Sequence, residues 1–272
     1  MEPPSISDED IRKFHQKIFL FYKEHKRDLP WRKTTNPYNI LVSEFMLQQT
    51  QVSRVIEYYK TWMEKWPIIQ KLANEKYKNV LQTWMGLGYN RRALYLHNTS
   101  KVIVDDFQGN VLTAVKHYGK LPGIGLYTSK AVQIFSANAD IATVDTNIRR
   151  IFINEFYLEE TLPDKELFQI AERCLPIGRS RDWHNALMDY GSMFLTSRKT
   201  GIKPKTQQSQ FKGSDRQIRG KILRMLLNEK RTEYQLNQQL RVDSERLSEI
   251  LNKMLKEKTL SKTEEYYHVP TA

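Results

Sequence analysis

Two carboxylates, Glu44 and Asp145, lie in settings that would give them opposite protonation states. Glu44 stands between Leu41 and Phe45 in a mostly apolar run of helical period, where desolvation would raise its pKa and keep it protonated near neutral pH. Asp145 directly precedes a predicted helix, whose N-terminal dipole would hold it ionised. A protonated acid paired with an anion suits the hydrolysis of a glycosidic bond, in which one group protonates the leaving group and the other stabilises an oxocarbenium-like sugar.

Each carboxylate also has a simpler interpretation when it is taken alone. Glu44 would then be a solvated carboxylate on a helix surface, and Asp145 would be an ordinary helix N-cap. The chemical interpretation therefore depends on what else the chain places around these two residues.

A glycine-containing turn lies upstream of Asp145. It runs from Leu121 to Thr128 and holds Gly123 and Gly125 on either side of one apolar residue. Glycine supplies the positive φ and the bare backbone that a tight turn between two helices requires. The amides that open the following helix would attract a phosphate, because they lack intrahelical partners and lie at the positive end of the helix dipole. The turn therefore predicts a helix-hairpin-helix that grips DNA without reading its sequence.

The charge of the chain also points to a polyanionic partner. The formal net charge is +12 over 272 residues, and phosphate neutralisation supplies most of the sequence-independent affinity for nucleic acid. On charge alone, a merely basic protein is the alternative. The excess is concentrated near the C-terminus, since residues 197–272 hold 17 Lys or Arg against nine Asp or Glu.

Cys174 is the single cysteine, which excludes an intrachain disulfide and a four-thiolate metal or iron–sulfur site. We therefore expect no metal and no cofactor. The first residues lack the basic and apolar regions of a secretion signal, and no apolar run reaches membrane-spanning length. These features predict a cytoplasmic, nucleoid-associated monomer with no membrane partner.

Hydrophobic periodicity predicts an all-α fold for residues 1–200. Ser7 and Asp10 form a candidate capping box, and apolar residues then recur on one face of the first helix. The turn at Thr34–Pro37 starts the next helix. Further helical runs are predicted at 38–49, 51–65, 76–84, 91–105, 111–118, 127–137, 146–156, 164–174 and 182–196. Strand-like alternation is scarce, so we expect a two-lobed helical domain.

A linker and a small basic domain are predicted to follow. Polar residues, glycine and proline dominate residues 201–214, whereas residues 215–272 contain three amphipathic helices and a possible terminal hairpin from Thr259 to Val269. This order matches a winged helix-turn-helix, and a small helical cap packed on the main domain is the alternative.

Several motifs in a fixed order carry a resemblance to a known family. They are Trp31–Tyr38, the helix Ser43–Val52, the turn Gly86–Tyr89, the hairpin at Leu121–Thr128 and the segment Val144–Asn147. In this order the chain resembles the helix-hairpin-helix DNA glycosylases of the HhH-GPD superfamily, and among them the MutY-type adenine glycosylases. The resemblance covers roughly residues 25–196.

The resemblance implies catalytic roles for four residues. Glu44 would donate a proton to N7 of adenine, and Asp145 would stabilise the oxocarbenium-like sugar or bond to it transiently. Tyr127 would lie in the pocket and hydrogen-bond near Asp145, and Asn147 would orient the carboxylate or the water. Bifunctional relatives have a lysine at the position of Tyr127, so the resemblance implies a monofunctional enzyme that leaves an abasic site.

The resemblance also implies DNA contacts. Leu87 and Tyr89 would wedge between base pairs when the nucleotide is flipped out, with core packing as their alternative. Gln48, Gln49 and Thr50 would contact the opposite, 8-oxoguanine-bearing strand, or would simply form a polar helix end. The remaining expected contacts, chiefly to phosphate, are Arg32, Arg91, Arg92, Lys130, Gly123 and Gly125.

The chain departs from the family pattern at two places. Most relatives carry four cysteines after the segment that resembles Asn185–Gly191, and these hold an iron–sulfur cluster. Here Phe194–Ser197 follow, so we expect helix packing to hold the region without a cluster. MutY-type enzymes also usually end in a Nudix-like domain that helps to read 8-oxoguanine, and the basic winged-helix-like segment stands in its place.

Three functions remain open on the sequence. The first is a monofunctional adenine glycosylase acting on double-stranded DNA with adenine opposite 8-oxoguanine or guanine. The second is a mismatch thymine or uracil glycosylase, a branch that also has tyrosine at the position of Tyr127. The third is a non-catalytic DNA-binding module. Gln48–Thr50 favours the first over the second, and the joint presence of Glu44, Tyr127, Asp145 and Asn147 speaks against the third.

Overall fold

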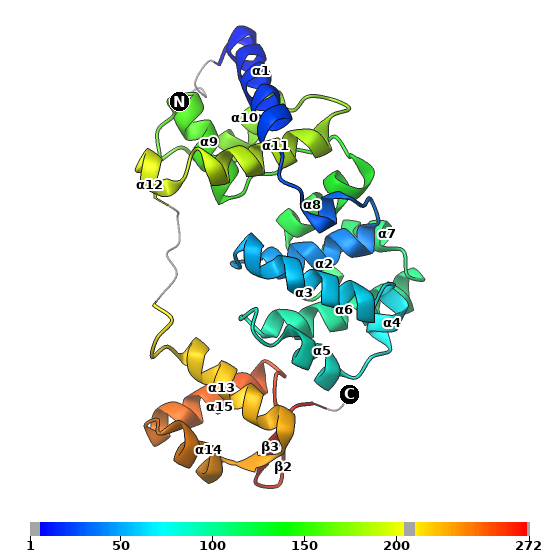
Figure 1. The fold of residues 1–272 in the computed structure, drawn as a ribbon, viewed down its shortest axis with the longest axis vertical. Helices are drawn as coiled ribbons and strands as arrows, with labels where there is room; N and C mark the ends of the chain where they lie inside the picture. Colours follow the sequence, from blue (N-terminus) through cyan, green and yellow to red (C-terminus); the bar gives the residue numbers. More distant parts are fainter. Residues whose placement is uncertain (1–5, 204–209, 271–272) are drawn as a thin grey trace. The chain divides into compact units, whose positions relative to one another are not determined.

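The chain folds into two compact units, each assembled from two separate stretches of sequence. A computed structural model describes residues 6–203 and 210–270 (Figure 1). One unit consists of Met1–Leu41 and Ile124–Gln207, and the other of Val42–Gly123 and Gln208–Ala272. Residues 204–209 of the predicted linker lie outside the described residues. The domain limits at 1–200, 201–214 and 215–272 stay predictions.

The described residues of the first unit form helices joined by loops, without any β-strand. It contains α1 (Asp8–His25), the short 3₁₀ turn η1 (Pro30–Arg32), α8 (Leu126–Ala137), α9 (Thr146–Glu155), α10 (Asp164–Arg173), α11 (Ser180–Met193) and α12 (Ser197–Thr200). The predicted capping box starts α1, because the Ser7 hydroxyl accepts from the Asp10 amide and the Asp10 carboxylate accepts from the Ser7 amide.

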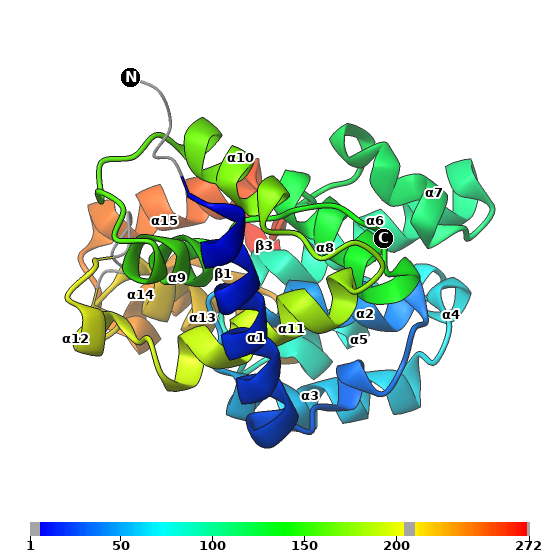
Figure 2. The same cartoon turned by 90° about the horizontal axis from the view of Figure 1, so that it is seen from above.

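Aromatic side chains hold α1 against α9 and α11. The predicted apolar face of α1 is buried, and α1 crosses and packs against α11 in both views (Figures 1 and 2). Phe14 meets Trp183 edge to face with ring centroids 5.3 Å apart, and it lies 5.7 Å from Phe152. Such pairs add stability beyond the area they bury. The core of this unit therefore fixes α9, the helix that begins after Asp145.

A buried ion pair joins the start of the chain to α11. Asp189 is 0% exposed, and Arg32 donates to both of its carboxylate oxygens at 2.7 and 2.8 Å. Arg27 binds the same carboxylate through its side chain and its amide. The Arg32 side chain is itself 7% exposed and is engaged by Asp189, so its predicted contact with DNA stays a prediction that this geometry does not favour. A buried aspartate recruited Arg32, because a lone buried charge is costly.

The second unit contains further helices and a C-terminal segment. Its helices are α3 (Val52–Lys65), α4 (Ile69–Ala73), α5 (Tyr77–Trp84), α6 (Arg91–Phe107) and α7 (Val111–Lys116), followed by η2 (Tyr118–Lys120). Trp62 and Trp84 are fully buried and pack with centroids 5.6 Å apart. The sequence missed α4, since five residues after Pro67 are too few to show a helical period.

The C-terminal segment has the expected winged-helix order. It runs α13 (Asp215–Asn228), β1 (Arg231–Thr232), α14 (Glu233–Leu240), α15 (Ser244–Lys256), β2 (Ser261–Thr263) and β3 (Tyr266–His268). The strands form an antiparallel sheet in the order β1-β3-β2, around a core that includes Leu226, Leu247 and Met254. The hairpin of β2 and β3 confirms the prediction. β1 was missed because two residues carry no alternation.

α2 (Pro37–Leu47) begins in the first unit and continues into the second. Its start follows the predicted turn, where the Asn36 side chain accepts from the Tyr38 amide at 2.9 Å. The predicted helical runs thus match observed helices to within a few residues at each end. Within the described ranges, no helix is long and apolar enough to cross a membrane.

The Asp189 ion pair predicts a large and specific loss of stability. Asp189→Asn would leave two partly buried guanidinium groups without their counter-charge, so we expect the free energy of unfolding in urea to fall by about 3–5 kcal/mol. The matched control is Asp28→Asn, which breaks the exposed pair with Lys33 and should change stability by less than about 1 kcal/mol. Equal losses of unfolding free energy in the two variants would show that the buried pair stabilises the fold no more than the exposed pair does.

Candidate active site

Glu44 lies on α2 between fully buried neighbours. Phe45 and Met46 are 0% exposed and Ser43 is buried, whereas Glu44 itself is half-buried. The apolar flank that the sequence indicated is therefore real, and it lies beside the carboxylate on the same helix. Residues 42–47 of α2, including Glu44, belong to the second unit, whereas Asp145 belongs to the first.

Arg92 holds the C-terminal end of α2. Its guanidinium donates to the backbone carbonyls of Phe45, Met46 and Gln48 at 2.7, 3.0 and 2.6 Å. The other terminal nitrogen donates to the Thr50 hydroxyl and to the Gly88 carbonyl. Arg92 is buried, and this burial lowers its pKa to about 10, so it stays charged at neutral pH. Helix-end carbonyls use the donors of Arg92, so its expected phosphate contact stays a prediction that this geometry does not favour.

The predicted wedge turn is tightly shaped. Gly86 has φ +115°, and an added Cβ there would collide with the hydroxyl of Tyr58, which donates to the Met85 carbonyl at 3.0 Å. Leu87 is only 3% exposed and packs inside, which agrees with the alternative of core packing, and its role as a wedge in DNA stays a prediction. Its amide bonds to the Trp84 carbonyl, which turns the side chain into the core.

Tyr89 is the more accessible aromatic of this turn. It is half-buried and has the left-handed φ of +48°. Two guanidinium groups lie near its ring, that of Arg92 at 5.5 Å and that of Arg216 at 5.0 Å from the centroid. Its predicted stacking role in DNA stays a prediction.

The three polar residues after α2, Gln48, Gln49 and Thr50, differ in their exposure to solvent. Gln48 is half-buried and Gln49 is exposed, with Gln49 in the left-handed region at φ +54°. The Thr50 hydroxyl accepts from Arg92 at 2.9 Å, so it is part of the helix-end network. Gln49 is thus the member of the triplet best placed to meet a partner.

The hairpin assigns different roles to its two glycines. Gly123 has φ +75°, and an added Cβ would lie 2.6–2.8 Å from the ring and Cβ of Tyr95. Gly125 has φ −98° and an added Cβ would meet nothing within 4 Å, so the expected positive φ holds only at Gly123. Gly125 is the N-cap of α8 and makes no side-chain cap. Glycine at the N-cap thus offers no side-chain acceptor to the first turn of α8.

Asp145 caps α9 and is held by its neighbours. One carboxylate oxygen accepts from the Ile148 amide at 2.7 Å, and the other accepts from the Asn147 side chain at 3.3 Å. Arg150 donates to the Asn147 side-chain oxygen at 2.6 Å and also binds the carbonyl of Leu195. The structure thus brings Asp145, Asn147 and Arg150 into one chain of hydrogen bonds. The sequence missed Arg150, although its spacing of three from Asn147 was a usable signal.

Burial raises the pKa of Asp145 above its ordinary value, although bonds from Ile148 and Asn147 and the charge of Arg150 act against this rise. The direction is opposite to that expected from the helix terminus alone. Burial dominates because protein replaces most of the solvent around the carboxylate. A carboxylate held in this way is less stabilised by water and can interact strongly with a developing positive charge.

Tyr127 and Lys130 lie on α8. Tyr127 is half-buried in its first turn, and its predicted hydrogen bond near Asp145 stays a prediction. The Lys130 ammonium donates to the Ala142 carbonyl at 3.2 Å and lies 4.0 Å from the centre of the Phe168 ring. The expected phosphate contact is therefore not what Lys130 makes here. Its pKa is lowered, chiefly by burial.

Arg91 is an exposed member of the predicted DNA-contacting set. Its guanidinium lies 4.7 Å from the centre of the Tyr95 ring and 3.5 Å from the Glu257 carboxylate. Unlike Arg92, it keeps its charged end near solvent. Among residues 6–203 and 210–270, no cluster of three or more His, Cys, Asp or Glu side chains could hold a metal ion.

A glycine hairpin that leads into a helix, followed by a helix-capping aspartate bonded to a nearby side-chain amide, makes up a helix-hairpin-helix arrangement. Residues 42–176 match the model of the HhH-GPD superfamily base excision DNA repair proteins. An adenine DNA glycosylase of Mycolicibacterium smegmatis is 35% identical over an alignment of 230 residues, and the match covers 77% of this chain and 78% of that protein. The chain therefore belongs to the HhH-GPD superfamily and to its DNA glycosylase enzymes.

Other relatives differ in how much of their length is matched. The mouse adenine DNA glycosylase is 32% identical over 226 residues, and the match spans 78% of this chain but only 44% of that protein. Among solved structures, a thermostable thymine-DNA glycosylase is 28% identical with a TM-score of 0.64, covering 73% of this chain and 91% of that one. Endonuclease III in a trapped DNA complex has a TM-score of 0.63 at 17% identity, which shows a shared fold.

The two hairpin glycines predict contrasting variants. Gly123→Ala would force a Cβ onto Tyr95 at positive φ, so we expect the free energy of unfolding to fall by about 1–3 kcal/mol. Gly125→Ala is the control, since its Cβ would enter open space and stability should change by about 0.5 kcal/mol or less. Urea unfolding of both variants measures the difference. A loss at position 125 as large as at 123 would contradict this geometry.

The raised pKa of Asp145 predicts that Asp145→Asn is more stable than the wild type at neutral pH. The folded protein binds the carboxyl proton of Asp145 more tightly than the unfolded chain does. The stability that this protonated carboxyl group contributes is therefore fully present below pH 3.8 and is lost as the pH rises through the raised pKa. Asp145→Asn keeps an N-cap oxygen and should melt at a higher temperature than the wild type at neutral pH. The difference should vanish below pH 3.8. A lower melting temperature at pH 7 would contradict the direction of the shift.

Proposed function

We propose that this chain is a monofunctional adenine DNA glycosylase that removes adenine mispaired with 8-oxoguanine or guanine in double-stranded DNA. The observation that carries the proposal is the 35% identity to an adenine DNA glycosylase over 77% of this chain. The retained Gln48–Gln49–Thr50 triplet, which is of the MutY type, supports adenine as the base removed.

In the proposed reaction Glu44 acts as the general acid. Its helix flanks are apolar, which favours a carboxyl group that keeps its proton near neutral pH. Transfer of that proton to N7 of the flipped-out adenine makes the base a neutral leaving group. The bond between N9 and C1′ then breaks with its electron pair on the base, and the sugar becomes an oxocarbenium-like cation.

Asp145 is proposed to meet that cation. The bonds from Ile148 and Asn147 fix both carboxylate oxygens before the reaction, so little reorganisation is needed when charge develops. Water adds to C1′ and leaves an abasic site. Tyr127 has no amine with which to form a Schiff base, so the strand stays intact.

DNA binding is proposed to rest on backbone amides and on cations. The amides that open α8 after Gly125 lack a side-chain cap, as a phosphate site requires. The net charge of +12 supplies long-range attraction to the duplex. No iron–sulfur cluster takes part in the proposal, because the single cysteine, Cys174, is buried.

A thymine mismatch glycosylase is the second candidate. One observation favours it, namely the 28% identity to the thermostable thymine-DNA glycosylase structure. The deciding experiment offers the purified protein duplexes that carry A, T or U opposite 8-oxoguanine or guanine, followed by alkali to cut abasic sites. Cutting at A that requires alkali supports the adenine proposal. Cutting only at T or U assigns the second candidate, and no cutting at all overturns both.

Glu44→Gln predicts a loss of chemistry without a loss of binding. The amide cannot donate the acidic proton, so we expect single-turnover adenine excision to fall by about 10²–10⁴-fold. Affinity for the mismatched duplex should change by less than about threefold, because the side chain keeps its shape.

The matched control is Glu57→Gln, an exposed carboxylate on α3 that pairs with Lys60. It should leave both excision and affinity unchanged. Weaker duplex binding by Glu44→Gln in proportion to its lost excision would mean that Glu44 serves structure rather than proton transfer.

A further inference from the structure

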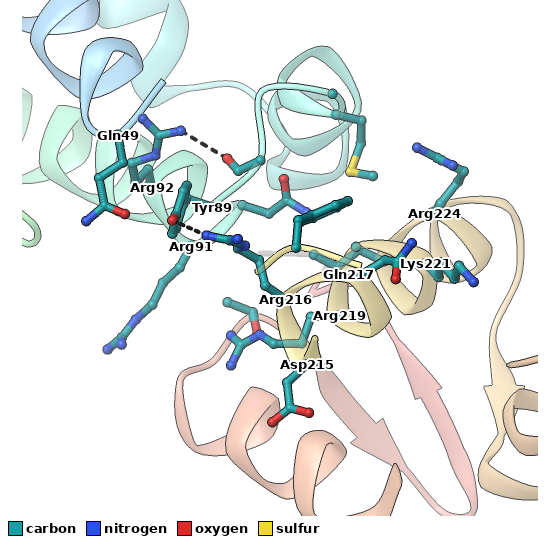
Figure 3. A pocket seen from close by; sticks show the side chains of 18 of the residues that line it. Gln49, Tyr89, Arg91, Arg92, Asp215, Arg216, Gln217, Arg219, Lys221 and Arg224 are labelled. Atoms are coloured by element: carbon teal, nitrogen blue, oxygen red, sulfur yellow. Dashed lines mark hydrogen bonds between the residues drawn. The ribbon is translucent and has the colours of Figure 1, made fainter. Parts of the chain in front are cut away.

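The second unit contains a cavity of about 710 Å³ whose walls come from distant parts of the sequence. Gln49, Tyr89 and Arg91 line one wall, and the other consists of α13 with the nearby Glu257 (Figure 3). We call this cavity the α13 groove. The proposed chemistry at Glu44 and Asp145 does not account for its α13 wall.

The α13 groove is strongly cationic. α13 contributes Arg216, Arg219, Lys221 and Arg224 to its lining. The two acids of the lining are engaged, since Glu257 pairs with Arg219 and lies 3.5 Å from Arg91. Asp215 pairs at 2.7 Å with Arg246, which is outside the lining. Lys221 and Arg224 are exposed along α13, where a phosphate can reach both.

Aromatic rings lie among these cations. The Arg216 guanidinium is 5.0 Å from the centre of the Tyr89 ring and 5.4 Å from that of Phe211. It also donates to the Tyr89 hydroxyl, as Figure 3 shows. A cation over an aromatic face occupies the position in which a nucleobase would stack, and the two contacts have similar strength. Exchange of Arg216 for a base on Tyr89 is therefore energetically accessible.

Gly220 is an independent indication that a ligand approaches the backbone of α13 closely. It lies within α13, where glycine destabilises a helix by about 1 kcal/mol relative to alanine. Its backbone is not at positive φ, and an added Cβ would meet nothing within 4 Å. Packing inside this chain therefore does not require glycine, yet the residue lines the groove. A strand approaching the helix backbone would require it.

We propose that the α13 groove binds a DNA strand that contains at least one unpaired nucleotide. The unpaired base stacks on Tyr89 in place of Arg216, and the neighbouring phosphates pair with Lys221 and Arg224. The inference rests on the proposed function only in taking DNA as the partner. It assigns DNA contact to α13, rather than to α15, the last helix of the winged-helix segment.

The test uses the full chain and two fluorescent probes of equal length and charge, an oligothymidylate and an oligomer of abasic residues. Fluorescence anisotropy should show at least fivefold tighter binding of the oligothymidylate, because stacking on Tyr89 needs a base. Lys221→Ala with Arg224→Ala should weaken oligothymidylate binding about tenfold. It should also reduce the slope of log affinity against log salt by about 1.4, as expected for two lost contacts to a single strand.

The matched control removes two exposed lysines from α15, by Lys253→Ala with Lys256→Ala. It loses the same charge and should change affinity and salt slope by less than half as much. Gly220→Leu tests the groove without a change of charge and should weaken the oligothymidylate at least fivefold, with unchanged thermal unfolding as the folding check. Equal affinity for both probes, or an equal loss in the α15 variant, overturns the proposal.

Excision assays separate this inference from the proposed function. If the wild type removes no base from any duplex but the α13 variants still lose oligothymidylate binding, the groove stands and the proposed activity fails. If adenine is excised normally and the α13 variants bind both probes like the wild type, the groove fails alone.

Discussion

One buried guanidinium organises much of the second unit. Arg92 reaches from the first turn of α6 to the last carbonyls of α2 and to the carbonyl of Gly88. These carbonyls lie at the negative end of the α2 dipole, where a positive charge is stabilising. Without Arg92, helix-end acceptors would be buried without donors, which is costly. The helix that carries Glu44 and the turn that carries Tyr89 therefore depend on the same side chain.

In the first unit the corresponding charged groups are two carboxylates. Arg27 and Arg32 form ion pairs with Asp189, whereas Asp145 accepts hydrogen bonds from the Ile148 amide and the Asn147 side chain. Burial still raises the pKa of Asp145, so its anion is held at some cost to the folded state. Such a cost is common where a group has to act on a charge that develops later. Asp189 is fully compensated and structural, and Asp145 is held ready for chemistry in the proposed reaction.

Much of the fold could be predicted from the sequence, because local signals dominate it. The capping box of α1, the amphipathic helices, the turn before α2 and the left-handed Gly123 all follow from residues close together in the chain. The terminal hairpin also follows from a short alternation. The elements that the sequence did not predict are too short to show a period, namely α4, α12, β1 and the turns η1 and η2.

The roles of arginines could not be predicted in the same way. Arg32 and Arg92 look like surface cations in the sequence, and both are buried beside acceptors that other segments supply. The partner of Arg32 is Asp189 on α11, and no local pattern connects the two. Leu87 is similar, since burial at a turn depends on what packs against it. The burial and the partners of such residues depend on tertiary contacts. Glu44, Asp145 and Asn147, in contrast, could be chosen as candidates from the local sequence pattern and from the order of the motifs.

The contact between Gly86 and Tyr58 links two positions that are distant in the sequence. The phenol hydroxyl of Tyr58 fills the space that a side chain at position 86 would need, and it also holds the Met85 carbonyl. A side chain at position 86 therefore requires a shorter residue at position 58, whereas position 58 can change while residue 86 stays glycine. A lineage that acquires a side chain at 86 has to shorten residue 58 first and find another donor for Met85. The two positions should accordingly vary together among related sequences, and the order of the two changes should be the same in each lineage.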